Sequence, residues 1–231
     1  MNYTEAVLQE FNRDFSLADP SDILKWAVQS FDDKLAVVTS FQPTGIVTMH
    51  MLSQFAPDTA ILTLDTGLLF PETYALMDDL EQRLNLNLIR VKPEQTVQQQ
   101  EERYGTALWE RDADACCNLR KVVPLASALG GYDAWIAGLR RDQNGRANIP
   151  IVSWDRKNQK VKLSPFANWS EGMIWQYIDR YDLPYNALHD QGYPSIGCKP
   201  ESCTSPSNGG DNERSGRWAN QGKNECGIHV A

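Results

Sequence analysis

Short apolar segments alternate with helical patterns over the first two-thirds of this chain, and this alternation constrains the fold most strongly. Residues 35–39 (LAVVT) and 60–64 (AILTL) are apolar and rich in β-branched side chains, which predicts buried strands. Residues 86–91 and 134–137 are further strand candidates. Helices are predicted at residues 46–55, 71–84, 119–129 (broken by Pro124) and 170–181. Because such alternation implies crossover connections, we expect an α/β fold with a doubly wound, mostly parallel sheet.

The length and composition suit one domain. With 231 residues and 42% hydrophobic content, the chain can bury a full core as a single domain over residues 1–231. We expect a helical segment over about residues 1–34. After about Pro184 the pattern dissolves into Gly, Pro, Ser and Asn, which predicts a loop-rich C-terminal tail, mobile over about residues 205–231.

Polar residues follow three of the predicted strands. The three loops are residues 40–45, 65–67 and 138–143. In doubly wound sheets, ligands bind beyond the carboxyl ends of the strands, so we expect these loops to meet at one site. Each loop also has a simpler interpretation, as an ordinary connection, a helix-capping turn or a solvated pair of arginines.

The chemistry of these loops favours an anionic nucleotide. The amides and hydroxyls from Ser40 onward precede a helix N-terminus, which suits an oxyanion. Asp65 offers a carboxylate for a ribose or base, and Gly67 allows close approach. Arg140 and Arg141 can bind sulfate or phosphate bidentately. The formal net charge of −8 argues against a general nucleic-acid binder but not against a small anionic substrate.

Five cysteines set a further constraint. No signal peptide opens the sequence and no apolar run approaches the roughly 18 residues of a membrane span, so we expect a cytosolic protein without a membrane segment. There, cysteines more often hold metal or do chemistry than form disulfides. Cys226 lies in a polar, glycine-rich stretch near His229 and is a candidate nucleophile, with an unremarkable terminal cysteine as the alternative. The other four are candidate metal ligands: Cys116, Cys117, Cys198 and Cys203.

Several motifs, in this order and spacing, together carry a family resemblance. They are residues 64–67 (LDTG) with 70–74 (FPETY), Cys116-Cys117 with Arg120-Lys121, residues 138–143, 192–198 (GYPSIGC), 216–218 (GRW) and 225–229 (ECGIH). The chain resembles the assimilatory adenylyl-sulfate and phosphoadenylyl-sulfate reductases from about residue 35 to residue 229. This resemblance implies an adenine nucleotide α-hydrolase-like fold.

The resemblance also implies a two-step reduction of adenylyl sulfate to sulfite and AMP, within sulfate assimilation and cysteine biosynthesis. Cys226 would attack the sulfonyl sulfur and form a cysteine S-sulfonate, and thioredoxin or glutaredoxin would release sulfite. His229 and the arginines are expected to screen charge and to lower the pKa of the Cys226 thiol. The implied substrate-binding residues are Ser40, Leu64, Asp65, Thr66, Gly67, Lys121, Gly138, Arg140, Arg141, Asp142, Gln143, Arg214 and Arg217.

The cysteine pairs match the cluster-binding branch of this family. The resemblance implies that Cys116, Cys117, Cys198 and Cys203 bind a [4Fe-4S] cluster, with Lys121 linking its charge to the substrate. The family's second pair reads Cys-x-x-Cys, whereas two extra residues separate Cys198 from Cys203 here. A labile cluster, a zinc ion or an empty site therefore remains an alternative. Gln42-Pro43 also replaces the Ser-Gly of many relatives, which leaves the sulfate contacts of that loop open.

Other functions stay open at this point. Phosphoadenylyl sulfate is the alternative substrate, although no extra basic contact for a 3′-phosphate is evident. Nucleotide-activating ligases and tRNA-thiolating enzymes share related folds, but their Ser-Gly-Gly pyrophosphate loop is absent at residues 40–45. A non-catalytic cluster or redox sensor would not need Cys226, His229 and the arginines together. The sequence does not determine the oligomeric state, and a homo-oligomer is one option.

Overall fold

The computed structural model describes residues 3–143, 145–207, 214, 216–218, 223 and 225–229. Within these residues a six-stranded sheet has the order β3-β2-β1-β4-β6-β5. Its strands are β1 (Leu35–Thr39), β2 (Ala60–Leu64), β3 (Asn87–Val91), β4 (Ala134–Ala137), β5 (Val152–Asp155) and β6 (Lys160–Leu163). All neighbouring pairs are parallel except β5 and β6. The expected α/β fold with a mostly parallel sheet is confirmed.

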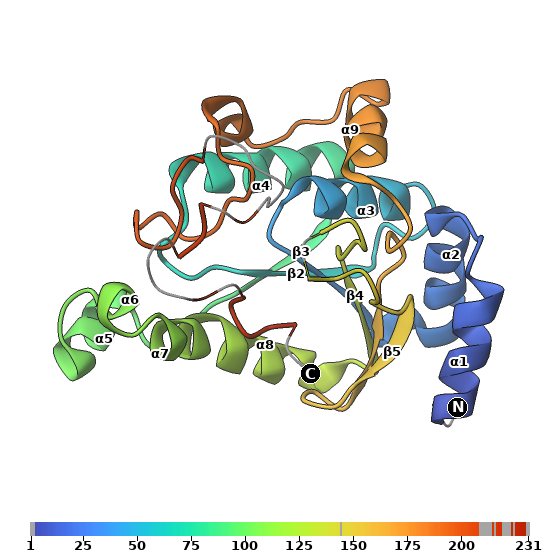
Figure 1. Cartoon of the computed structure of the whole chain (residues 1–231), viewed down its shortest axis with the longest axis horizontal. Coiled ribbons are helices and arrows are strands. Elements are labelled where there is room, and N and C mark those ends of the chain that lie inside the picture. The colour runs from blue at the N-terminus through green and yellow to red at the C-terminus, as the bar shows by residue number, and fades with distance from the viewer. Residues whose placement is uncertain are drawn as a thin grey trace.

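Helices cover both faces of this sheet (Figure 1). The described helices are α1 (Glu5–Asp14), α2 (Pro20–Phe31), α3 (Pro43–Ser53), α4 (Pro71–Leu84), α5 (Val97–Tyr104), α6 (Leu108–Arg111), α7 (Ala113–Cys117), α8 (Val123–Ala128) and α9 (Glu171–Arg180). Figure 1 shows α3, α4 and α9 above the sheet and α8 below it. None of the described helices is long and apolar enough to cross a bilayer.

Alternating side chains of each strand enter two separate cores. Val37 and Ile136 pack into the larger core with α2, α3, α4 and α9. Their neighbours Ala36 and Trp135 pack on the opposite face, against α8. Because successive strand residues point to opposite faces, a sheet that is covered on both sides needs continuous apolar strands. This explains why β1, β2 and β4 have the bounds predicted from sequence.

Two predicted helices differ from the structure in informative ways. Helix α3 begins at Pro43 rather than at residue 46, since a proline is favoured in the first helical turn. Pro124 does not break its helix, because residues 118–122 form a π-helical turn just before it. Proline lacks an N–H and clashes with the carbonyl four residues earlier, and a widened turn relieves both problems. This turn carries Lys121.

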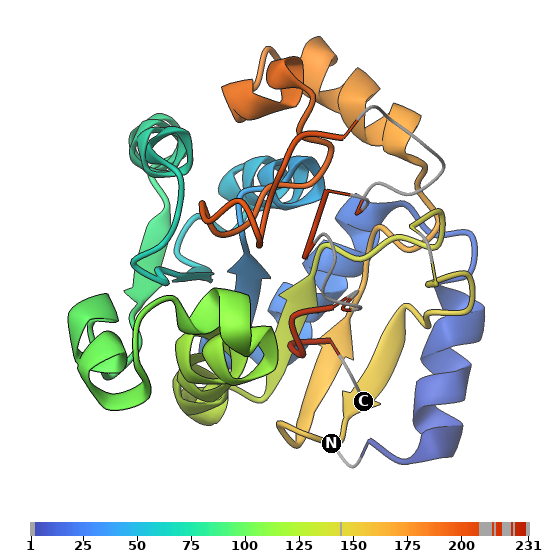
Figure 2. The ribbon, with the colours of Figure 1, turned by 60° about the vertical axis from the view of Figure 1, so that its left-hand side comes forward.

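The β5–β6 hairpin and helices α5 to α7 were not predicted. The two strands are only four residues long, and β6 has two lysines among its four residues. Of the C-terminal tail expected over residues 205–231, residues 208–213, 215, 219–222, 224 and 230–231 lie outside the described residues. In Figure 2 the arrowheads of β1 and β4 point toward the orange and red segments that follow α9.

Candidate active site

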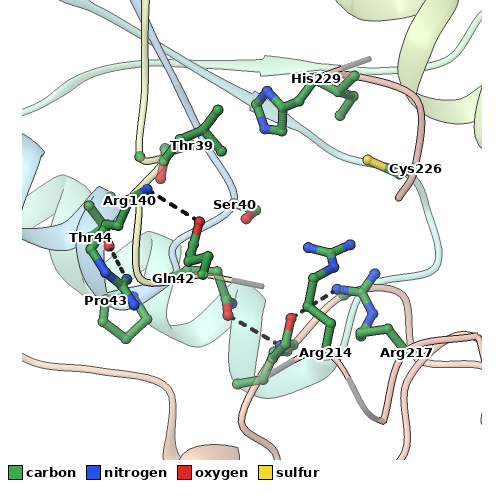
Figure 3. Close-up of a pocket in the computed structure, with 18 of the residues that line it drawn as sticks. Thr39, Ser40, Gln42, Pro43, Thr44, Arg140, Arg214, Arg217, Cys226 and His229 are labelled. Carbon is green, nitrogen blue, oxygen red and sulfur yellow. Dashed lines mark hydrogen bonds between the residues drawn. The ribbon is translucent and has the colours of Figure 1, made fainter. Parts of the chain in front are cut away.

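A cavity of about 200 Å³ lies at the carboxyl ends of β1 and β4. This is the point where the strand order reverses, with β2 and β3 on one side of β1 and β4 on the other. We call it the main cavity. Eleven of the residues predicted for the site line it: Ser40, Leu64, Thr66, Lys121, Gly138, Arg140, Gln143, Arg214, Arg217, Cys226 and His229. Figure 3 labels ten of the lining residues around this space.

The loop between β1 and α3 turns sharply and presents Ser40 to the main cavity. Phe41 adopts a positive φ of 57° and buries its ring in the core. The Thr39 hydroxyl accepts a hydrogen bond from the Phe41 amide at 3.0 Å. A Cβ on Gly45 would lie 2.2 Å from this hydroxyl, so the first turn of α3 can pack here only with glycine. Gln42 accepts a hydrogen bond from the Ile196 amide at 3.2 Å and fixes the opposite wall.

The loop after β4 directs one of its two arginines into the main cavity. Arg140 Nη1 donates to Thr44 Oγ1 at 2.8 Å, and its Nε pairs with Asp142 at 2.9 Å. Arg141 does not line the cavity, because its Nε donates to the Ile149 carbonyl and its Nη1 to Asn168. Asp142 is also outside the lining and supports Arg140 instead.

The turn after β2 contributes backbone and Thr66 rather than Asp65. The Asp65 carboxylate accepts hydrogen bonds from Tyr74 Oη at 2.6 Å and from the Gly67 amide at 3.1 Å. Neither Asp65 nor Gly67 lines the main cavity. Thr66 is buried, and its Oγ1 lies 3.5 Å from Cys198 Sγ. This turn therefore connects the main cavity to a predicted metal ligand.

Arg214 and Arg217 enter the main cavity opposite the β1–α3 loop (Figure 3). Arg217 Nε donates to the Cys203 carbonyl at 3.0 Å, and its guanidinium lies 4.5 Å from the Trp218 ring centroid. A Cβ on Gly197 would lie 2.1 Å from Arg217 Nη2. The missing side chain of Gly197 therefore provides the space in which this guanidinium lies.

Cys226 is half-buried at the edge of the main cavity. Its Sγ donates to Glu225 Oε1 at 3.2 Å. Burial raises the pKa of the Cys226 thiol and Glu225 adds to this, whereas Lys121 acts in the opposite direction. Burial also opposes the charge of Lys121, but Cys198 and Cys226 outweigh it and raise the pKa of Lys121.

His229 is placed differently from its expected role. Its ring stacks on Trp135 with centroids 5.7 Å apart, and burial with the nearby Lys162 lowers its pKa to about 3. The imidazole is therefore neutral near pH 7. The expectation that a cationic His229 lowers the pKa of Cys226 does not hold in this structure, where Lys121 is the leading cation.

Arg146 and Glu225 are two of the charged lining residues that were given no role from the sequence. Arg146 Nη2 and Glu225 Oε2 form an ion pair at 2.7 Å, although they lie 79 positions apart. Arg146 follows the predicted loop 138–143 within the same connection, and Glu225 directly precedes Cys226. Their neighbourhood was visible in the sequence, but their pairing depends on how the C-terminal segment docks.

The four remaining cysteines line a second, smaller cavity, which we call the cysteine cavity. Cys116 and Cys117 come from α7, and Cys198 and Cys203 from the loop after residue 197. Each is 6–7% exposed. Within the loop, the Cys203 and Thr204 amides both donate to the Pro200 carbonyl, at 2.7 and 3.0 Å. These bonds turn the lengthened loop back, so that both of its thiols reach one cavity.

The thiols of the cysteine cavity repel one another's negative charge. Burial and the neighbouring cysteines raise the pKa of Cys116 to about 11 and that of Cys203 to about 12. Burial opposes ionisation of Cys198 as well, but Lys121 and a hydrogen bond from Thr66 lower its pKa overall. Four thiols with this mutual repulsion form a donor set that a cationic metal centre would neutralise. Among the described residues, however, no three His, Cys, Asp or Glu side chains are arranged to hold a single metal ion.

Lys121 belongs to both cavities. Its side chain is buried between them. The neighbouring Arg120 lines only the cysteine cavity of these two. Arg120 instead donates to the Thr66 carbonyl at 2.6 Å and to Gln100 Oε1 at 3.0 Å, which holds the β2 turn against the π-helical turn.

Comparison with known proteins agrees with this arrangement. The family model for the phosphoadenosine phosphosulfate reductase domain matches residues 34–206. The chain is 46% identical over 226 residues to the adenosine 5′-phosphosulfate reductase of Salinibacter ruber, covering 97% of this chain and 89% of that relative. It is 47% identical over 209 residues to adenosine 5′-phosphosulfate reductase 1 of Bacillus subtilis, covering 90% and 89%.

A solved structure of similar fold supports the same relationship. The phosphoadenylyl-sulfate reductase from Candida auris, in a phosphate complex, superposes with a TM-score of 0.77 at 28% identity, covering 86% of this chain and 97% of that one. The resemblance carried by the sequence motifs is thereby confirmed. The match over residues 34–206 and the identity to these relatives show that the chain belongs to the phosphoadenosine phosphosulfate reductase domain family.

Proposed function

We propose that this protein reduces adenylyl sulfate to sulfite and AMP, as a cytoplasmic enzyme of sulfate assimilation and cysteine biosynthesis. The observation that carries the proposal is the position of Cys226, whose thiol lines the main cavity together with Lys121 and four arginines. A nucleophile and a cationic surface in one cavity are what transfer of an anionic sulfonyl group requires. The names of the relatives favour the same substrate.

In the first step the Cys226 thiol loses its proton to solvent and attacks the sulfonyl sulfur. The bond between that sulfur and the bridging phosphate oxygen breaks, AMP leaves and Cys226 carries an S-sulfonate. Negative charge grows on the departing phosphate, so nearby donors lower the barrier. We propose Arg140, Arg214 and Arg217 for the phosphate and Lys121 for the sulfonyl group, since its charge also favours the Cys226 thiolate.

In the second step a dithiol protein such as thioredoxin or glutaredoxin supplies the electrons. One of its thiolates attacks Cys226 Sγ, which releases sulfite and forms a mixed disulfide. Its second thiol then resolves this disulfide and restores the Cys226 thiol, so two electrons pass from the dithiol to the sulfonyl sulfur. Cys226 must be accessible for this step, and it is held by the short segment of residues 225–229 rather than by a helix or strand.

We propose that the nucleotide lies along the strand ends. The backbone of Leu64 and Gly138 would take the adenosine, with Ser40, Thr66 and Gln143 nearby. Since Asp65, Gly67, Arg141 and Asp142 lie outside the lining, we propose that they position the loops rather than contact substrate. His229, being neutral, would act by packing or by hydrogen bonding through Nδ1, which is buried and has no partner among the described residues.

We further propose that Cys116, Cys117, Cys198 and Cys203 hold a [4Fe-4S] cluster. Their convergence on one cavity supports this, because four thiolates form the usual ligand set and bind four different irons rather than one ion. Such a cluster, when bound, would act electrostatically and structurally. Within the chain, Lys121 would remain buried and charged between the two cavities. Iron and sulfide analysis of anaerobic protein tests this, and one zinc per chain without sulfide would contradict it.

The reaction is tested by the intact mass of anaerobic protein after incubation with adenylyl sulfate in the absence of reductant. We expect the added mass of one SO₃ group, located on Cys226 by peptide mapping and released as sulfite by thioredoxin. An adduct formed only from phosphoadenylyl sulfate would reassign the substrate to the 3′-phosphorylated form. No adduct from either nucleotide would contradict the proposed reaction.

A further inference from the structure

The carboxylate of Glu225 lies inside the main cavity, against Arg146 and against Arg214, which is proposed to bind the substrate phosphate. Its Oε2 accepts a hydrogen bond from Arg146 Nη2 at 2.7 Å, and Arg214 Nη2 lies 4.0 Å from its Oε1. The Arg146 and Glu225 side chains are 14% and 23% exposed, so water screens this pair only weakly. The arginine surface thus already holds an anion that belongs to the protein.

The second carboxylate oxygen lies against the nucleophile. Glu225 Oε1 is 3.2 Å from Cys226 Sγ and 2.8 Å from the Cys226 amide nitrogen. Reacting atoms must approach to about 3–3.5 Å before a bond can form. Glu225 therefore occupies one of the positions from which a sulfonyl group can approach Cys226 Sγ.

Glu225 carries a negative charge, as the sulfonyl group of the substrate does. Burial opposes ionisation of Glu225, but Arg214 and hydrogen bonds from Cys226 outweigh it and lower the pKa of the carboxyl to about 2. The group is therefore ionised near pH 7. Arg140 and Arg217 hold other acceptors, Asp142 and the Cys203 carbonyl. Arg146 donates to Glu225 through Nη2 and to Gln143 through Nη1.

We propose that Glu225 is an internal anion that occupies the sulfonyl subsite of the empty enzyme and must be displaced by substrate. The inference rests on the proposed function, because it assigns the sulfonyl group to the position beside Cys226. Glu225 then acts as a positioning residue that weakens the binding of adenylyl sulfate. It should not weaken the binding of AMP to the same extent, because AMP lacks the sulfonyl group.

The test measures binding of adenylyl sulfate and of AMP by calorimetry, in proteins that carry Cys226→Ala to prevent turnover. Adding Glu225→Gln removes the charge and keeps the size. We expect adenylyl sulfate to bind about tenfold more tightly, which corresponds to about 1.4 kcal/mol, with AMP affinity changed less than about twofold. Glu225→Ala should change each affinity in the direction in which Glu225→Gln changes it. Circular dichroism checks that each variant is folded.

Glu81→Gln is the matched control. Glu81 pairs with Arg90 at 2.8 Å on the surface of α4 and should leave both affinities unchanged. An unchanged or weaker affinity of the Glu225 variants for adenylyl sulfate would overturn the inference. Equal tightening for adenylyl sulfate and AMP would also overturn it, because the effect would then be general charge attraction. If adenylyl sulfate bound neither parent nor variant, the proposed function itself would fail.

Discussion

The main cavity and the cysteine cavity hold the same functional group in contrasting surroundings. The four thiols of the cysteine cavity are 6–7% exposed and come from a helix and a tightly turned loop. Cys226 is half-buried, and its segment is held by side-chain contacts, including Arg146 to Glu225 and Lys157 to the Gly227 carbonyl. Burial and fixed backbone suit a ligand, whereas a nucleophile that must meet a second protein needs access.

The two cavities are joined by Lys121, which lines both, and by Arg217, which lines the main cavity and donates to the Cys203 carbonyl. The contrast therefore has a structural consequence. A change in the cysteine cavity should reach the main cavity through these two cations, whereas a change at Cys226 should leave the cysteine cavity intact.

Cys226→Ser should separate the two cavities most clearly, because it should abolish the reaction and leave the iron content unchanged. Removing the nucleophile should lower sulfite formation by at least about 10³-fold, because a serine hydroxyl is a poor nucleophile at neutral pH. Iron content per chain should stay that of the parent protein, since Cys226 does not line the cysteine cavity. Sulfite release and iron are measured on the same preparation. Substantial residual sulfite formation would refute the role of Cys226.

The reciprocal change is Cys203→Ser. We expect loss of iron and, through Arg217 and Lys121, about 10²-fold lower activity, because a thiolate ligand and its neighbouring contacts are lost together. The Cys226 thiol should remain available, which alkylation followed by peptide mapping can show. Full iron content in this variant would exclude Cys203 as a ligand.

These contrasts were only partly predictable from the sequence. Strands buried on both faces, such as β1, are continuously apolar and were found with the right bounds. The antiparallel β5 and β6 were missed because each strand is only four residues long, which is too short for an alternating pattern to stand out. A local pattern also cannot tell Arg140 from Arg141: only tertiary contacts with Thr44 and with Ile149 send one into the main cavity and the other away.

The site shows the same limit. The residues that carry motifs could be named in advance, and most of them line the main cavity. The pairing of Arg146 with Glu225 and the stacking of His229 on Trp135 could not, since each joins segments far apart in the chain. The charge of His229 was misjudged for the same reason, because its low pKa comes from burial and from Lys162.

Lys121→Met tests whether the shared lysine couples the cavities. The substitution keeps most of the aliphatic volume and removes the charge beside Cys198 and Cys226. We expect about 30-fold lower kcat/KM, since donors that face developing charge contribute a few kcal/mol. A Lys34→Met control changes an exposed lysine on the surface and should be neutral. An unchanged kcat/KM would show that Lys121 does not act on the reaction.

Gly197→Ala tests the second connection without altering any charge. The added Cβ would lie 2.1 Å from Arg217 Nη2, so the guanidinium must shift away from the Cys203 carbonyl. We expect about a tenfold higher KM. A hydrogen bond from a charged donor contributes about 1.5–3 kcal/mol, and the displaced Arg217 guanidinium should lose part of this contribution. Gly130→Ala, where a Cβ would meet nothing within 4 Å, is the control. Equal KM values for both variants would mean that the position of Arg217 does not affect substrate binding.

The smallest effect is expected from pH, which acts on the docking of the C-terminal segment and not on the cysteine cavity. Burial lowers the pKa of His229 to about 3, whereas an undocked imidazole titrates near 6.5. Docking is therefore fully stable above about pH 6.5 and loses stability as pH falls toward 3, because the undocked state binds the proton first. One pH unit below 6.5, the loss is about 1.4 kcal/mol at most.

The three histidines of the chain make this measurable by NMR titration, with a His229→Asn variant identifying the signal. A His229 pKa well below 6.5 would show that the segment is docked in solution as in the structure. Protection of the Glu225–His229 amides from hydrogen exchange should then fall between pH 6.5 and 5, and less so in the His229→Asn variant. A His229 pKa near 6.5 would mean that the segment samples water freely, and Cys226 would then reach the main cavity only when substrate draws it in.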